Sequence, residues 1–272
     1  MNQGMNQAMN QAMDSAVDTA ADLAVPNQPR GSALRQSAFL LDIDGTILDI
    51  APSPAQVWVP TGLRQTLTRL VELTQGAVAL VSGRSINDID LVFSPLQLAA
   101  IGVHGAEMRF SGEAQVQSRI APLSTELKRR LATIAELGPG ILVEDKGYSL
   151  ALHYRLAPEK GAAILDAVNK ICSDAPPGAV EVLPGKRVVD IKPAAINKGM
   201  AVGELMQNAP FAGRRPIFIG DDTTDLPVFG IIPKFGGRAY SVGGIRAAVD
   251  GHFDRPESVR SWLARIAESA AE

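Results

Sequence analysis

Residues 38–46 read Ala-Phe-Leu-Leu-Asp-Ile-Asp-Gly-Thr, an apolar run that leads directly into two aspartates and a glycine. An uninterrupted apolar run of this kind is typical of a strand buried on both faces, as in a parallel sheet. Three more runs have the same plan: residues 77–81, 99–103 and 216–219 precede Ser-Gly-Arg, His-Gly and Gly-Asp-Asp. Helical patterns separate the runs, so we predict an α/β fold with a doubly wound, mostly parallel sheet of the Rossmann type.

Capping residues indicate where the helices begin. Apolar residues at helical spacing lie between Pro60 and Gly76, a proline and a glycine of the kind that flank helices. Ser85 and Asn197 are the predicted N-caps of two further helices, and Ser258 is the predicted N-cap of the last one. Open α/β sheets bind ligands at the carboxyl ends of their strands, so the polar motifs that follow the apolar runs predict the site.

The middle of the chain has a different pattern. Between Tyr148 and Tyr154 apolar residues alternate with polar ones, which is typical of a strand with one covered face. Helical patterns accompany such strands in this region. We therefore predict an α+β cap domain over residues 110–191, inserted into a core domain formed by residues 37–109 and 192–272.

Composition limits the function classes. The 272 residues carry a net charge of −3, which gives no general attraction to nucleic acid or to an anionic membrane. The single Cys172 excludes an internal disulfide framework and fits a reducing compartment. We expect a cytoplasmic monomer in which Trp58 and Trp262 pack against other side chains. Residues 1–36, which open on a Met-Asn-Gln repeat, are predicted to be a low-complexity, disordered arm.

Aspartates dominate the predicted site. Asp42 and Asp44 follow one buried strand, and Asp221, Asp222 and Asp225 follow another. If the two strands are neighbours, the carboxylates converge and need a cation to offset their repulsion. Hard oxygen ligands of this kind select Mg²⁺. The alternative is that these residues are only turn formers and helix caps.

A second set of residues has the chemistry of an anion site. Ser82, Gly83 and Arg84 lie between a strand and a helix, where a hydroxyl and backbone N–H groups can bind a phosphate. Lys198 stands at a predicted helix start, an unfavourable place for a cation unless an anion lies beside it. The alternative is that these are loop residues and solvated surface charges.

The order of these motifs resembles that of the haloacid dehalogenase-like (HAD) phosphatases and, more narrowly, the trehalose-6-phosphate phosphatase family. The narrower resemblance depends on Gly-Val-His-Gly-Ala-Glu at 102–107 and Asn-Lys-Gly at 197–199. It depends also on Glu144-Asp-Lys146 before His-Tyr-Arg at 153–155, and on Gly185-Lys186-x-x-x-Asp190. One departure is Leu226-Pro227 after Asp225, where that family usually carries acidic residues.

The resemblance implies a role for each residue. Asp42 would be the nucleophile that forms an aspartyl-phosphate, and Asp44 the general acid and then the general base. Mg²⁺ would be held by Asp42, the Asp44 carbonyl and Asp221, with Asp222 or Asp225 in support. The phosphate would be bound by Ser82, Gly83 and Lys198, and the sugar by Arg84, His104, Glu144, Lys146 and Asp190.

The implied activity is the Mg²⁺-dependent hydrolysis of trehalose 6-phosphate in trehalose biosynthesis. A phosphatase for another sugar phosphate, such as sucrose 6-phosphate or a glycosyl phosphoglycerate, is the nearest alternative. A sugar-phosphate sensor without activity is another, although it would not need both Asp42 and Asp44. In a third, residues 1–36 recruit a partner such as the synthase that makes the substrate. For Glu144 and Lys146, the alternative to a role in sugar binding is that they lie on the solvated face of a strand.

Overall fold

The structure, a computed structural model, describes residues 28–52 and 56–269, so residues 1–27 of the predicted arm lie outside it. For the rest of the arm the prediction of disorder is wrong, because Ser32–Arg35 form a helix and Leu34 is buried in the apolar core. Within the described residues, eight strands form one sheet, and six of them are parallel, as predicted. The last two pair antiparallel. The order across the sheet is β12 (Gly251–Phe253), β11 (Arg238–Val242), β10 (Arg215–Gly220), β1 (Ser37–Leu41), β2 (Val78–Val81), β3 (Ala99–Gly102), β4 (Glu107–Arg109) and β5 (Gln117–Ser118).

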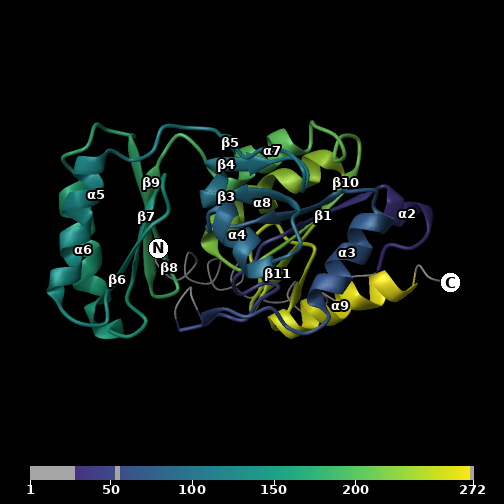
Figure 1. The fold of residues 1–272 in the computed structure, drawn as a ribbon, viewed down its shortest axis with the longest axis horizontal. Helices are drawn as coiled ribbons and strands as arrows, with labels where there is room; N and C mark the ends of the chain where they lie inside the picture. Colours follow the sequence, from purple (N-terminus) through teal and green to yellow (C-terminus); the bar gives the residue numbers. More distant parts are fainter. Residues whose placement is uncertain (1–27, 53–55, 270–272) are drawn as a thin grey trace, which may run out of the picture.

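Strand β1 is buried on both faces because helices cover both sides of the sheet (Figure 1). Phe39 and Leu41 pack in one apolar core, and Ala38 and Leu40 pack in the other, as the period of two in a strand requires. The first core includes α2 (Ser32–Arg35), α3 (Leu63–Leu73), α4 (Ile86–Phe93) and α9 (Pro256–Ser269). The second includes α7 (Lys198–Leu205) and α8 (Leu226–Ile231).

Two of the three predicted N-caps lie at the start of a helix in the structure. The Ser85 side chain accepts the Asp88 N–H and the Asn197 side chain accepts the Met200 N–H, so both N-caps are confirmed. The prediction for Ser258 is wrong, because α9 already begins at Pro256. Proline suits the first turn of a helix, where its missing N–H costs no hydrogen bond.

A second, antiparallel sheet follows the order β6 (Leu142–Asp145), β7 (Leu150–His153), β9 (Val188–Pro193) and β8 (Val180–Gly185). Helices α5 (Thr125–Ala132) and α6 (Gly161–Cys172) cover its outer face, away from the large sheet (Figure 1). We call this part the cap. Strand β5 lies within the predicted cap range 110–191 but pairs in the large sheet.

Short 3₁₀ helices complete the described elements: η3 (Val103–Gly105), η4 (Thr133–Leu137), η5 (Pro158–Lys160), η6 (Thr223–Asp225) and η7 (Ile232–Phe235). Trp262 is buried as expected, whereas Trp58 is 64% exposed, so the packing prediction is wrong for Trp58. Among the described helices, none has the length and apolar character to span a membrane.

Candidate active site

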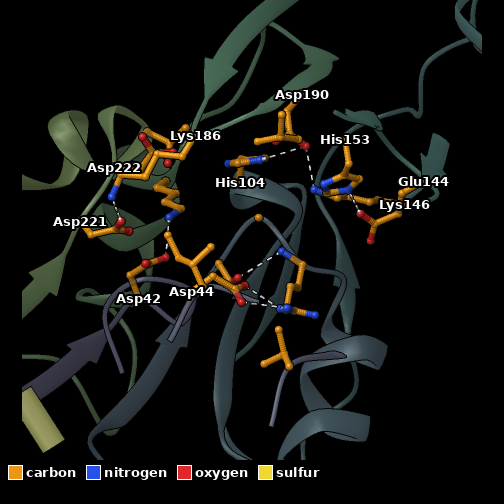
Figure 2. A pocket seen from close by; sticks show the side chains of 18 of the residues that line it. Asp42, Asp44, His104, Glu144, Lys146, His153, Lys186, Asp190, Asp221 and Asp222 are labelled. Atoms are coloured by element: carbon orange, nitrogen blue, oxygen red, sulfur yellow. Dashed lines mark hydrogen bonds and ion pairs between the residues drawn. The ribbon is translucent and has the colours of Figure 1, made fainter. Parts of the chain in front are cut away.

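A cavity lies between the carboxyl edge of the large sheet and the cap (Figure 2). Every predicted site residue except Asp225 lines it, and Asp225 is fully buried beside it. The residues come from the segments that follow β1, β2, β3 and β10, from the start of α7, and from the inner face of the cap sheet. The strand-end motifs and the cap motifs therefore belong to one site.

Asp42 is the first residue after β1, and its carboxylate is buried. One oxygen accepts a hydrogen bond from Lys198 Nζ at 2.8 Å and the other from the Thr46 hydroxyl at 3.0 Å. Burial raises the pKa of Asp42 well above its usual value, an effect that Lys198 opposes and the neighbouring carboxylates of Asp225 and Asp221 reinforce. Further positive charge in the cavity would favour the ionised form that a nucleophile needs.

Three buried carboxylates stand together, as their places after the neighbouring strands β1 and β10 predict. Asp42, Asp221 and Asp225 each offer an oxygen within 4.8 Å of the others. Gly45 is necessary for this approach, because its φ is +86° and a Cβ there would lie 2.3 Å from an Asp221 oxygen. This set of hard oxygen donors fits Mg²⁺.

Asp225 also shapes the loop that carries the other two aspartates after β10. One of its oxygens accepts the N–H groups of Asp221 and Asp222 at 2.9 and 3.0 Å, and the other accepts Lys198 Nζ at 2.7 Å. The Asp222 side chain accepts the Thr223 N–H at 2.7 Å and caps η6. Asp222 thus lies outside the group of three carboxylates.

Asp44 is not one of the three clustered carboxylates and pairs instead with Arg84. The guanidinium makes two hydrogen bonds to the carboxylate, from Nε at 2.6 Å and from a terminal nitrogen at 2.8 Å. The Arg84 N–H in turn bonds to the Ser82 hydroxyl at 3.1 Å. The bidentate geometry fixes the direction in which the Asp44 carboxylate faces the cavity.

The inner face of the cap sheet carries one hydrogen-bonded pair, Glu144 with His153, and one ion pair, Lys146 with Asp190 (Figure 2). Glu144 lies 2.6 Å from His153, and Lys146 lies 2.7 Å from Asp190. Alternate residues of these strands, such as Val143 and Val189, pack under the helices, so the charged ones face the large sheet.

Both carboxylates of these pairs remain acidic in spite of their burial. Burial alone would raise the pKa of Asp190, but the Lys146 ammonium outweighs it and holds that pKa well below the usual range. Burial also opposes ionisation of Glu144, whose pKa is nevertheless lowered by its hydrogen bond to His153. The cap therefore presents permanent charges to the cavity.

His104 approaches the cap from the core domain. Its Nε2 lies 3.7 Å from the Asp190 carboxylate, beyond hydrogen-bond distance, and neither ring nitrogen has a hydrogen-bond partner among the described residues. Burial lowers the pKa of this histidine. Its φ of +54° follows a φ of +46° at Val103, a rare conformation for a β-branched residue. Gly83 makes room for the ring, because a Cβ there would lie 2.6 Å from it.

Two cap residues contact the core domain but were not among the predicted site residues. Lys186, in the turn between β8 and β9, places Nζ 2.6 Å from an Asp221 oxygen. Arg155 donates a hydrogen bond to the Ala51 carbonyl. Both residues belong to motifs on which the family resemblance depends, so that resemblance was the sequence signal that could have identified them as site residues.

A family model described as trehalose-phosphatase matches residues 40–245. The chain belongs to the trehalose-phosphatase family. It is 36% identical over 230 residues to the trehalose-6-phosphate phosphatase of Escherichia coli, covering 84% of this chain and 86% of that one. It is 38% identical over 233 residues to a probable trehalose-phosphate phosphatase of Sinorhizobium fredii, covering 85% and 87%.

Solved structures share the trehalose-phosphatase fold. The C-terminal domain of the Candida albicans trehalose-6-phosphate phosphatase superimposes with a TM-score of 0.77 at 21% identity, covering 90% of this chain and 99% of that one. A trehalose-phosphatase is a phosphoric monoester hydrolase, so the chain is an enzyme of that class. The departure at Leu226-Pro227 is accommodated, because Pro227 lies in the first turn of α8.

Proposed function

We propose that the protein hydrolyses trehalose 6-phosphate to trehalose and phosphate. The observation that carries the proposal is one cavity with a buried aspartate and lysine pair on the sheet side and fixed charges on the cap side. The relatives from E. coli and S. fredii are named for trehalose phosphate. A sensor would not need this arrangement around Asp42.

Asp42 is the proposed nucleophile. Its carboxylate oxygen attacks phosphorus, the bond from phosphorus to the sugar oxygen breaks, and an aspartyl-phosphate forms. Asp44 gives its proton to the leaving sugar oxygen, which is otherwise a poor leaving group, and then takes a proton from the water that hydrolyses the aspartyl-phosphate. The observed pairing with Arg84, which donates to both carboxylate oxygens, orients the ionised form of Asp44 that takes the proton in the second step. Phosphate leaves and Asp42 is regenerated.

Lys198 and Ser82 are the proposed ligands of the phosphoryl oxygens, together with the backbone at Gly83. Lys198 already lies beside Asp42, so it can neutralise charge on the nucleophile and on the phosphate. Asp42 and Asp221 would hold Mg²⁺ with the Asp44 carbonyl, and Asp225 would support them. Bound Mg²⁺ screens the repulsion between two anions and stabilises charge on the transferring group.

The cap is proposed to bind the sugar through Glu144, Lys146 and Asp190. Charged groups make short, strong hydrogen bonds to hydroxyls when water is excluded. In the register of the sheet, Glu144 and Asp190 flank the small side chain of Ala151, which leaves space between them on the inner face. His104 has two unpartnered ring nitrogens and could bond the sugar from the core side.

The experiment is a comparison of phosphate release from trehalose 6-phosphate, sucrose 6-phosphate, glucose 6-phosphate and glucosyl phosphoglycerate. The proposal predicts the highest kcat/KM for trehalose 6-phosphate. A higher value for another member of the panel would overturn the proposed sugar specificity but keep the phosphatase chemistry. The cytoplasmic location, the monomeric state and an association with the synthase stay predictions from the sequence.

A further inference from the structure

Lys192 is a buried cation that the proposed mechanism does not use. It lies near the end of β9 in the cap sheet, and its side chain is 3% exposed. The chain leaves β9 after Pro193, past the predicted cap boundary at residue 191, and reaches α7 at Lys198. A buried ammonium needs hydrogen-bond acceptors, so its partners indicate what Lys192 holds.

The Lys192 ammonium joins the cap sheet to this crossover. It donates to the Ile196 carbonyl at 2.5 Å and to the Glu181 carboxylate, with the Pro193 carbonyl further away at 3.4 Å. Glu181 stands directly opposite Lys192 on β8, so that contact is a cross-strand pair. Ile196 instead belongs to the crossover, whose path the hydrogen bond from Lys192 restrains.

The restrained segment leads directly to the phosphate-binding lysine. Asn197 follows Ile196, and its side chain caps α7 through the Met200 N–H at 3.0 Å. The Asn197 carbonyl also packs closely on Gly105, where a Cβ would lie 2.9 Å from it. The next residue is Lys198, which bonds both Asp42 and Asp225.

We infer that Lys192 is a positioning residue for Lys198. By holding the Ile196 carbonyl it fixes the start of α7, and so the place of the Lys198 ammonium against Asp42 and the phosphate. The inference deepens the proposed function and rests on it. Because a displacement of about 1 Å at a reacting group can lower a rate about 100-fold, a restraint on the Ile196 carbonyl, two residues before Lys198, matters for turnover.

A purely structural role makes a different prediction. If Lys192 only stabilises the cap sheet through Glu181, removing either partner of that pair has the same effect. Glu181→Gln is therefore the matched control, because it removes the carboxylate charge and leaves the bond from Lys192 to Ile196. Lys192→Arg keeps a cationic donor, and Lys192→Met keeps the length of the chain without the charge.

The experiment measures the dissociation constant of inorganic phosphate by calorimetry with Mg²⁺, and kcat for trehalose 6-phosphate, in folded variants. We expect Lys192→Met to weaken phosphate binding and to lower kcat, each about tenfold or more. Lys192→Arg should recover part of both losses, and Glu181→Gln should leave both close to the wild-type values. Thermal unfolding shows whether each variant is folded at the assay temperature.

Wild-type phosphate affinity and kcat in folded Lys192→Met would overturn the inference. Equal losses in Lys192→Met and Glu181→Gln would also overturn it, because they would assign the effect to the cap sheet. If the methionine variant does not fold, Lys192→Gln replaces it under the same criteria. Phosphate binding does not depend on the sugar. If the wild-type protein binds phosphate but does not hydrolyse trehalose 6-phosphate, that result refutes only the proposed function.

Discussion

At the scale of single residues, the pairing of Arg84 with Asp44 orients the carboxylate that is the proposed general acid and base. We predict that Arg84→Met lowers kcat for trehalose 6-phosphate about 10- to 100-fold, because the Asp44 carboxylate loses its two fixed hydrogen bonds. Steady-state kinetics on the folded variant checks this. Arg69→Met, which removes an exposed arginine paired with Glu72, is the matched control and should not change kcat. An unchanged kcat in Arg84→Met would refute the role.

His104 should make the stability of the protein depend on pH. Burial outweighs the nearby Asp190 carboxylate, and Lys146 and Lys198 also oppose a positive charge, so the folded-state pKa of His104 lies below that of the unfolded chain. The unfolded chain therefore binds more protons in the window below about pH 6.5. The contribution of neutral His104 to stability is complete above this window and is lost as the pH falls.

The measurement is the free energy of unfolding in urea at pH values from about 7 to about 5. The wild-type protein should lose more stability over this range than His104→Gln, whose side chain does not titrate. Parallel curves for the two proteins would show that His104 has an ordinary pKa. A histidine titration followed by NMR gives the same answer for the folded state alone.

At the scale of elements, the cap sheet is proposed to bind the sugar, while residues at the edge of the large sheet are proposed to catalyse the reaction. We predict that Glu144→Ala lowers kcat/KM for trehalose 6-phosphate at least about tenfold, the cost of one or two lost hydrogen bonds to hydroxyls. Hydrolysis of p-nitrophenyl phosphate, which offers no sugar, should change much less. The control is Glu159→Ala, an exposed glutamate of the cap. Equal losses on both substrates would remove Glu144 from sugar recognition.

Helix α9 packs against the large sheet through a cluster of aromatic rings. Trp262 is buried, with its ring centroid 5.7 Å from that of Phe253 and 6.2 Å from that of Phe39. Trp262→Ala should lower the free energy of unfolding by about 3–5 kcal/mol, measured in urea. Trp58→Ala, at an exposed tryptophan, should change it by less than about 0.5 kcal/mol. Similar losses in both variants would contradict this packing account.

Elements with strong local signals were predictable from the sequence. Four of the six parallel strands were visible because burial on both faces leaves uninterrupted apolar runs, as in residues 38–41 and 216–219. Strands β11 and β12 were not predicted. Strand β5 was assigned to the cap range because its residues, Gln117 and Ser118, are exposed and carry no such signal. The misplaced start of α9 has a similar cause, because serine and proline both signal a helix start and Pro256 comes first.

The gathering of the candidate site residues around one cavity was predictable, but their contacts were not. The motifs gather because strand order brings the ends of β1 and β10 together. The pairing of Lys186 with Asp221 joins residues 35 positions apart across two sheets, and no periodicity encodes it. The bond from Arg84 to Asp44 spans 40 positions in the same way.

At the scale of the whole molecule, the proposed phosphatase site lies where the cap meets the carboxyl edge of the large sheet. The chain passes from the cap back to the core domain next to Lys198, so the arrangement of the cap and the phosphate site are physically connected. Opening and closing of such a cap would admit the sugar and release it.

The most direct test measures phosphate release from trehalose 6-phosphate by the wild-type protein with Mg²⁺ and with EDTA, beside folded Asp42→Asn with Mg²⁺. The proposed function predicts rapid release by the wild type with Mg²⁺, and none above background with EDTA or in Asp42→Asn. Turnover by Asp42→Asn at the wild-type rate, or no turnover of trehalose 6-phosphate by the wild type with Mg²⁺, would contradict it.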